Sequence, residues 1–553
     1  MDLAKDRHTE LSDQNGLKRV LTPQQPFGPI VTEDVMNLGR SNAGQLFDRN
    51  NRVYAQSVSD SPPTYIIGRK GAGKTAFLIG SDVAHDQPQI VLTTEDVYHE
   101  MLKVFHEYGR DHELFVGHRA DLWQALFDHV ALFHACRSFD SNDPQESLHV
   151  LTSYLGNSAE NGMNETLAAT RFLRELRKNI SDTRSTGFRD VIDNVTLGRT
   201  RFADARAALR IVLGRRERPP IIVMDNLEDL HLRLPELRPV LAGLFRCVGR
   251  MISANPGNRP YGVQICLPSE LWDLIHDIAA APEKDLQGRY LTIYWTAREL
   301  LRLTGTRLHL FLRTRHPDQL ELLQRRADGN DETDPSIALL RAALPPRIHS
   351  GLDIDEDPLA YLLRHTQLLP RHLIQILNSV FSRHDRGSAP WNVTPVAIIA
   401  GTRHAERLLV PGILSAYKAT FPKAAEALQR LTGRLEISFP ARKLHKVYNQ
   451  QGIRKLTDLD FDEFLSMLFT LGALGIRFDQ TGRYNKAHFQ YTFDYPLVAQ
   501  EESDHLCFHP LFTRYLMERS LPQLRARQAH ATYPYGCDPR GEDYRGTFGY
   551  LDS

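Results

Sequence analysis

The sequence predicts an α/β fold: a doubly wound parallel sheet with a helical insertion, a helical lid and a C-terminal winged-helix-like domain. Short apolar runs ending in glycine or acid alternate with segments of helical periodicity up to about residue 290. Beyond that point helical patterns dominate, and a helix followed by a hairpin-like segment lies near the end. With 553 residues and 42% apolar content, the chain can bury more than one core.

These patterns divide the chain into five parts. The N-terminus is polar and is expected to be a mobile arm, and the polar C-terminal end, which contains Gly, Pro and Tyr, is expected to be a flexible tail. The expected parts are the arm at 1–40, an α/β core at 41–290 with a helical insertion at about 95–218, a helical lid at 291–386, the winged-helix-like domain at 396–520 and the tail at 521–553.

Composition excludes several classes of protein. Lys+Arg and Asp+Glu both number 67, so no overall charge draws the chain to nucleic acid or anionic lipid. The five cysteines are far apart and lack the spacing of a zinc site, which is typical of a reducing compartment. The N-terminus does not resemble a signal peptide, and no run of about 18 apolar residues occurs. We therefore expect a cytoplasmic protein that does not insert into membranes.

Four buried strands are predicted in the core. The runs are PTYIIG at 63–68, QIVLTT at 89–94, PPIIVMD at 219–225 and YGVQICLP at 261–268. Continuous apolar runs of this length are typical of parallel strands that are covered on both faces. Ligands of such sheets bind at the carboxyl ends of the strands. We therefore expect the functional residues directly after these runs.

The intervening insertion is predicted to be helical. The segment 121–136 has apolar residues at three- and four-residue steps, which predicts a helix with one face in a core. The stretch 171–218 carries 13 basic and 6 acidic residues. This surplus is typical of a solvated helix face, and a surface for nucleic acid or an acidic partner is the alternative.

The segment GRKGAGKT at 68–75 carries the clearest chemistry. It fits the pattern G-x-x-x-x-G-K-[ST], with a predicted strand before it and a helix after it. The glycines allow a tight turn in which consecutive N–H groups converge on one anion, and the helix N-terminus adds its positive end. This pattern predicts a phosphate loop (P-loop) that binds a nucleoside triphosphate, ATP. The expected binding residues are Gly68, Arg69, Lys70, Gly71, Ala72, Gly73, Lys74, Thr75 and Ala76.

Two residues are predicted to bind Mg²⁺, and one lysine to act in catalysis. The Thr75 hydroxyl and the Asp225 carboxylate, which ends the run IIVMD, are the oxygen ligands expected for Mg²⁺. Lys74 is expected to reach the β- and γ-phosphates. The loop therefore predicts a P-loop NTPase core with ATP and Mg²⁺ as cofactors.

With these motifs, residues 40–385 resemble the AAA+/STAND branch of P-loop ATPases, particularly origin-recognition-like and bacterial defence-type members. Weaker parallels are ICLPSEL, the segment from Trp295 to Leu308 and HTQLLPR. The resemblance implies a polar sensor at Ser269 and a sensor arginine at Arg371. It also implies a homo-oligomer, a protein partner or effector, and a role in prokaryotic anti-phage defence.

The chain departs from that family at the position after Asp225. Asn226 stands where many members carry the glutamate that polarises the attacking water, and an amide cannot accept that proton. We expect Glu228, or else Asp229, to be the base. About 150 residues separate Thr75 from Asp225, which implies the helical insertion. Arg307 and Arg313 are candidates for an arginine finger offered to a neighbouring subunit.

The C-terminal part leaves two readings open. A winged helix places a helix in the DNA major groove, but such domains in STAND-like ATPases also pack as a lid or bind protein. His505 and His509 have metal-like i,i+4 spacing, but no third ligand is in view, so packing is expected. The cations near the predicted wing are Arg442, Lys443, Lys446, Arg454, Lys455, Arg483 and Lys486.

The sequence therefore predicts a Mg-dependent ATPase that acts as an oligomerising switch. An ATP-gated DNA-binding protein of loader or initiator type is the alternative. A small-molecule kinase is disfavoured, because no acceptor site is evident.

Overall fold

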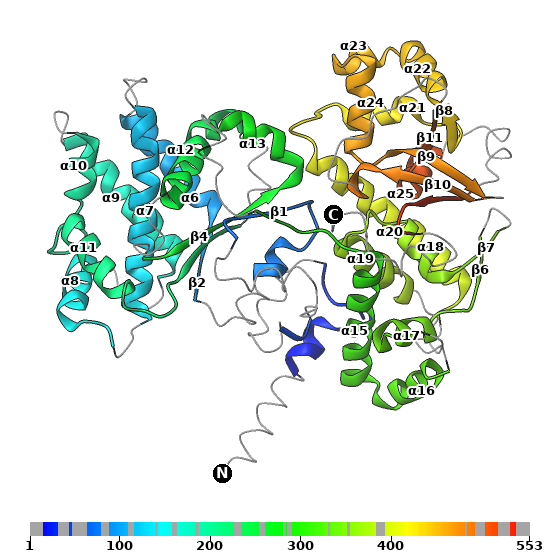
Figure 1. The fold of residues 1–553 in the computed structure, drawn as a ribbon, viewed down its shortest axis with the longest axis horizontal. Coiled ribbons are helices and arrows are strands. Elements are labelled where there is room, and N and C mark those ends of the chain that lie inside the picture. Colours follow the sequence, from blue (N-terminus) through cyan, green and yellow to red (C-terminus); the bar gives the residue numbers. More distant parts are fainter. Residues whose placement is uncertain are drawn as a thin grey trace. The chain divides into compact units, whose positions relative to one another are not determined.

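The computed structural model divides into two compact units (Figure 1). The core unit comprises Arg52–Lys70 and Phe77–Ile293, and the C-terminal unit comprises Met1–Asn51, Gly71–Ala76 and Tyr294–Ser553. None of the described helices is long and apolar enough to cross a membrane. The described residues are 15–30, 44–46, 63–78, 88–108, 115–138, 142–156, 163–182, 187–225, 234–253, 260–279, 284, 290–329, 332–350, 354–382, 393–481, 484–492, 504–517 and 531–537.

A five-stranded parallel sheet forms the centre of the core unit. Its strand order is β2-β3-β4-β1-β5. The four predicted runs are strands, and β1 and β3 are buried along their whole length. The short fifth strand was not expected, because it lies at the sheet edge and its outer residues are exposed. The strands are β1 (Tyr65–Gly68), β2 (Gln89–Thr93), β3 (Ile221–Asp225), β4 (Gly262–Pro268) and β5 (Tyr290–Thr292).

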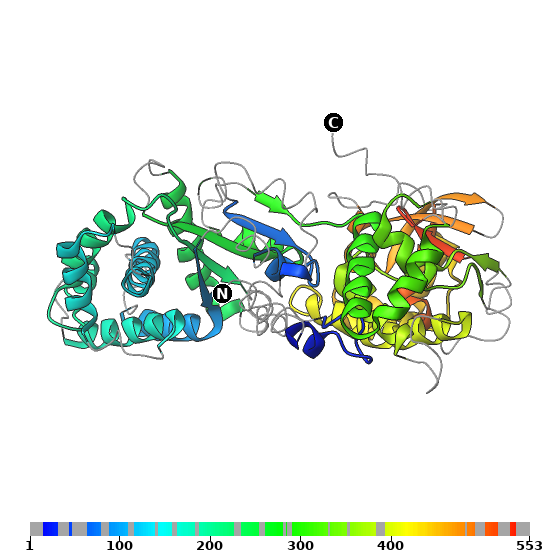
Figure 2. The same cartoon turned by 90° about the horizontal axis from the view of Figure 1, so that it is seen from below.

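The segment between β2 and β3 is helical, and α7 lies at its centre. Figure 2 shows α7 nearly end-on, with other helices of the insertion around it. Its apolar residues are buried on more than one side, and the Trp123 indole N–H donates to the Val240 carbonyl at 2.9 Å. The helices of the core unit are α6 (Thr94–Tyr108), α7 (Phe115–Arg137), α8 (Gln145–Leu155), α9 (Glu165–Asp182), α10 (Phe188–Asp193), α11 (Phe202–Leu213), α12 (Leu234–Ser253), η4 (Ser269–Leu271) and α13 (Trp272–Ile278).

From Tyr294 onward, the C-terminal unit contains several helices whose first turns are marked in the sequence. Thr296 caps α15 in a capping box with Glu299, and Asp334 and Asp357 cap helices that begin with proline. A short β-hairpin interrupts the predicted helical lid. These elements are α15 (Ala297–Arg315), α16 (Pro317–Ala327), α17 (Pro335–Ala342), β6 (Ile348–Ser350), β7 (Ile354–Glu356), α18 (Pro358–Arg364), α19 (Pro370–Phe381), α20 (Pro395–Ala416) and α21 (Ala424–Leu431).

A second five-stranded sheet, of order β12-β10-β9-β11-β8, completes this unit. A helix followed by the β9–β10 hairpin is present as expected, but three further strands join the hairpin, so the winged-helix assignment stays a prediction. The remaining elements are β8 (Ser438–Pro440), α22 (Ala441–Gln450), α23 (Ile453–Thr457), α24 (Phe461–Thr470), β9 (Leu474–Thr481), β10 (Tyr484–Phe489), η5 (Gln490–Thr492), β11 (His505–Phe508), α25 (Pro510–Met517) and β12 (Ala531–Pro534).

Both expected flexible ends contain ordered segments, which corrects the sequence prediction. In the arm, Leu17, Leu21 and Phe27 are buried, and the Phe27 N–H donates to Asn378 Oδ1 at 3.0 Å. In the tail, β12 is buried and pairs in parallel with β10. Few apolar residues in a polar stretch are enough to dock a segment when the acceptor surface is supplied by distant residues.

Candidate functional site

The loop at 68–75 adopts the geometry that its glycines predict. It follows β1, and residues 74–78 are helical. Gly71 and Gly73 have φ angles of +89° and +92°, which side-chain-bearing residues rarely adopt. Gly68 instead ends β1 and pairs with Pro268. The special backbone positions are therefore Gly71 and Gly73, and the helical turn begins at Lys74, which is buried.

In the core unit, the end of β4 lies beside the start of the loop. The pairing of Gly68 with Pro268 brings Ser269 and Glu270 to the edge where β1 ends. The Glu270 carboxylate accepts a hydrogen bond from the Lys70 N–H at 2.7 Å. The sequence predicts a role for Ser269 but not for Glu270, although an acid directly after a predicted strand end is a usable signal.

Asp225 occupies the corresponding position on β3. It is the last residue of that strand, is buried, and pairs with Thr93 of β2. A buried carboxylate needs a cation or hydrogen-bond donors to offset the cost of its desolvation. A bound metal ion is one such cation. Asn226 and the predicted bases Glu228 and Asp229 lie outside the described residues.

In the C-terminal unit, two side chains contact the second half of the loop. The Trp295 indole N–H donates to the Ala72 carbonyl at 2.7 Å. The side chain of Arg371, near the start of α19, lies against Gly71, where an added Cβ would be 3.0 Å from Arg371 Cβ and 3.5 Å from its Nε. That Nε is buried and has no hydrogen-bond partner among the described residues. The residue expected to be a sensor arginine is thus next to the loop.

Four further residues expected to bind ATP lie in the loop or directly after it. Arg69, Lys70, Thr75 and Ala76 are all partly exposed. Thr75 directly follows Lys74, which is buried.

Arg307 is not available as an arginine finger. Its side chain is buried and donates to the carbonyls of Phe27 at 2.9 Å and Leu46 at 3.3 Å, and burial lowers its pKa to about 10. It fastens the N-terminal segment to α15, which corrects the sequence expectation. Arg313 is exposed and donates to Gln45 Oε1 at 2.9 Å.

Much of the positive charge at 171–218 is neutralised within the insertion. Arginines of α9, α10 and α11, and one after α11, form ion pairs with acids, most of them on α6 and α7. A surface whose cations already face carboxylates has less charge to offer phosphates. The pairs include Arg177–Glu107 at 3.0 Å, Arg189–Asp121 at 3.1 Å, Arg206–Asp128 at 2.8 Å and Arg216–Asp143 at 2.7 Å.

In the part predicted to be a winged-helix-like domain, exposed acidic and basic residues lie on different helices. On α24 the exposed residues include Asp462, Glu463 and Ser466, whereas Arg442 and Lys446 are exposed on α22. Arg483 lies outside the described residues. His509 is buried, accepts from the Leu511 N–H at 3.1 Å and bonds to the Tyr491 hydroxyl, so it is a packing residue. No cluster of three metal-binding side chains occurs among the described residues.

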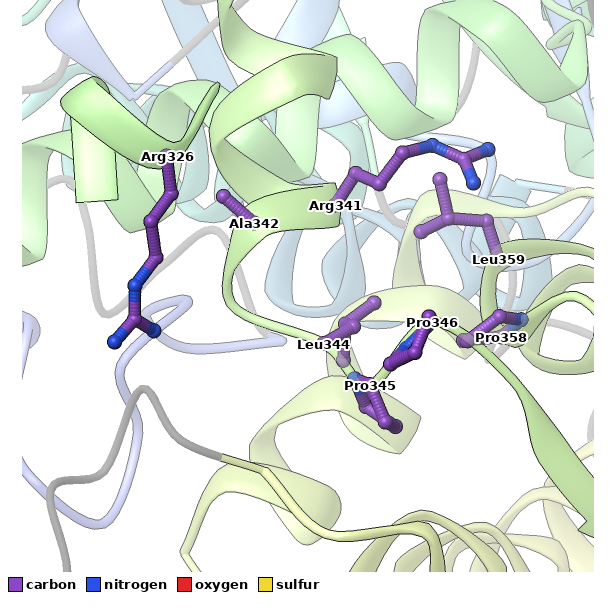
Figure 3. Close-up of a pocket in the computed structure, with 8 residues that line it drawn as sticks. All are labelled: Arg326, Arg341, Ala342, Leu344, Pro345, Pro346, Pro358 and Leu359. Atoms are coloured by element: carbon purple, nitrogen blue, oxygen red, sulfur yellow. The ribbon is translucent and has the colours of Figure 1, made fainter. Parts of the chain in front are cut away.

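Figure 3 shows a pocket of about 320 Å³ in the C-terminal unit. Its lining comes from α16, α17, α18 and the segment between the last two, and includes Arg326, Leu344 and Pro358. Its other arginine, Arg341, pairs with Asp357 at 2.8 Å. None of the predicted site residues lines it.

No protein-family model matches this chain, and no curated protein sequence does. Among solved structures, the chain is similar to the Walker-type ATPase of Pyrococcus abyssi, with 13% identity and a TM-score of 0.36 over 85% of this chain and 95% of that chain. A similarity at this TM-score is distant. The candidate site itself is a loop with two glycines at positive φ, between a buried parallel strand and a helical turn, in a mixed α/β fold.

Proposed function

We propose that the chain binds ATP with Mg²⁺ at residues 68–75 and hydrolyses it. The observation that carries this proposal is the pair of positive φ angles at Gly71 and Gly73, between buried β1 and the helical turn that starts at Lys74. This backbone directs successive N–H groups toward one anion.

Each residue then has a defined role. Lys74 binds the β- and γ-phosphates as a point charge, and the Thr75 hydroxyl and Asp225 carboxylate supply hard oxygen ligands that suit Mg²⁺. When bound, the ion would offset the charge of the phosphates. Ser269 and Arg371 sense the γ-phosphate, and Glu228, or else Asp229, positions the attacking water.

We further propose that nucleotide turnover drives an oligomerising switch with a protein partner, in prokaryotic anti-phage defence. This assignment rests on the resemblance of the two motifs and on the position of Arg371 against the loop. An ATP-gated DNA-binding role is less supported, because exposed positions of α24 carry Asp462 and Glu463, which repel phosphates.

The first test is ATP binding by calorimetry, with and without Mg²⁺. Lys74→Ala should lose measurable binding, whereas Lys423→Ala, at an exposed lysine paired with Glu426, should bind as the wild type does. A wild type that fails to bind ATP, or a Lys74→Ala variant that binds normally, would refute the site.

The second test concerns the switch. Light scattering on the wild type and Glu228→Gln, each without nucleotide, with ADP and with ATP–Mg, should show a larger assembly with ATP that the variant retains. An unchanged size would contradict the oligomerising switch while leaving ATP binding intact. DNA binding that weakens steeply with salt would then favour the alternative.

A further inference from the structure

The peptide between Ala72 and Gly73 lies in the middle of the loop and can point in two directions. In a trans peptide the C=O and the following N–H point in opposite directions, so the direction of the Ala72 carbonyl fixes that of the Gly73 N–H. Gly73 has a φ of +92°, and glycine tolerates positive and negative φ about equally. Sterics alone therefore do not hold this peptide in one orientation.

One side chain outside the loop holds that carbonyl. The Trp295 indole N–H donates to the Ala72 oxygen at 2.7 Å, and Ala72 is buried. Indole N–H is a donor only, so it can bind the carbonyl but not the N–H of a flipped peptide.

Trp295 is itself held in place by the start of α15. It directly precedes Thr296, whose hydroxyl accepts from the Glu299 N–H at 3.2 Å and whose N–H donates to Glu299 Oε2 at 2.9 Å. This capping box is buried and fixes the backbone next to Trp295. The indole is thus a preorganised donor rather than a mobile surface side chain.

We propose that Trp295 is a positioning residue for phosphate binding: by holding the Ala72 carbonyl, it keeps the Gly73 N–H directed at the bound phosphate. Without the indole the peptide can flip and present its carbonyl oxygen, which repels phosphate. This inference rests on the proposed ATP site, and it assigns a role to a residue outside the P-loop pattern.

The test uses the full chain and compares Trp295→Phe with Trp123→Phe. Both variants remove an indole hydrogen bond to a backbone carbonyl, but Trp123 is bound to Val240 in α12. Trp295→Phe should weaken ATP–Mg binding about ten- to a hundredfold, the range for a hydrogen bond to a charged group. Trp123→Phe should leave the dissociation constant for ATP–Mg unchanged. Because Trp123 is buried, this variant should lower the melting temperature more than Trp295→Phe does.

Inorganic triphosphate separates positioning from general damage. Because the affected donor serves phosphate rather than adenosine, Trp295→Phe should weaken triphosphate binding by the same factor as ATP. Equal affinity of Trp295→Phe and wild type would overturn the inference, as would equal weakening in both tryptophan variants. A wild type that binds neither ATP nor triphosphate would instead refute the proposed site.

Discussion

The side chain of Arg371 packs against the backbone of Gly71, 300 positions earlier in the chain. A Cβ at Gly71 would lie 3.0 Å from Arg371 Cβ and 3.2 Å from its Cδ. Position 71 therefore requires glycine for two reasons. Its φ is +89°, which side chains rarely allow, and the Arg371 side chain fills the space that a Cβ would need. This contact joins a predicted loop residue to a residue that only a family resemblance had suggested.

Gly71→Ala should abolish most ATP binding. A side chain in this backbone region costs about 1–2 kcal/mol, and the contact with Arg371 adds to it, so the dissociation constant should rise at least about tenfold. Gly412→Ala in α20 is the control, because no atom lies within 4 Å of its added Cβ. That variant should bind ATP normally and be more stable to urea by about 0.5–1 kcal/mol. Normal ATP binding by Gly71→Ala would show that this backbone is not needed.

Arg371→Gln should reduce affinity for ATP more than for ADP. The guanidinium next to the loop provides a positive charge, and its strongest interaction in the complex should be with the terminal phosphate of ATP, which ADP lacks. We expect about a tenfold loss for ATP and a smaller loss for ADP, measured by calorimetry. Arg403→Gln, at an exposed arginine of α20, should change neither constant. Equal losses for ATP and ADP would argue against a sensor role.

Glu356→Ala should destabilise the C-terminal unit strongly. The Glu356 carboxylate is buried, pairs with Arg364 at 2.9 Å and accepts from the Tyr533 hydroxyl of β12. Its loss leaves a buried guanidinium without its carboxylate, which costs about 3–5 kcal/mol. Glu321→Ala, from the exposed Arg325–Glu321 pair, should cost less than about 1 kcal/mol in urea unfolding. Similar costs for both variants would contradict a strong contribution of the buried Glu356–Arg364 ion pair to stability.

Glu406 should make stability depend on pH between about 6.5 and 8. Burial raises its pKa to about 8, although Arg364, Arg403 and Arg514 oppose the rise. Burial and Arg364 lower the pKa of His365, whose Nδ1 lies 2.6 Å from Glu406 Oε1. The two groups therefore form a neutral hydrogen-bonded pair at neutral pH.

The sign follows from which state holds more protons. Glu406 has a higher pKa in the folded state than in the unfolded state. It therefore contributes its full stabilisation of the folded state at pH values below its unfolded pKa, and this contribution is lost as the pH rises to about 8. The depressed pKa of His365 gives the opposite slope, but only below about 6.5. Between 6.5 and 8 the wild type should therefore lose about 1–2 kcal/mol relative to Glu406→Gln, measured by urea unfolding at each pH. A constant difference between the two proteins would refute the raised pKa.

Where the structure describes it, the core agrees with the sequence because its signals are local. The runs containing β1 and β3 are apolar enough to be buried along their whole length, whereas β2, at the edge of the sheet, leaves Val91 49% exposed. The glycines of the loop are needed by its own backbone. The helical periodicity of the insertion is local in the same sense. The sequence does not predict the short strands β5 and β12. Each becomes a strand by pairing with the edge of another strand, β1 for β5 and β10 for β12.

The sequence by itself therefore determined the phosphate-binding loop and the strands around it, since steric and hydrophobic rules act within a few residues. Only the tertiary structure decided which distant side chains serve that loop. It buries Arg307 against the carbonyls of Phe27 and Leu46, and it places the Trp295 indole on Ala72 and the Arg371 side chain on Gly71. Such contacts depend on packing between elements far apart in the chain, and that information is not contained in the spacing of any short motif.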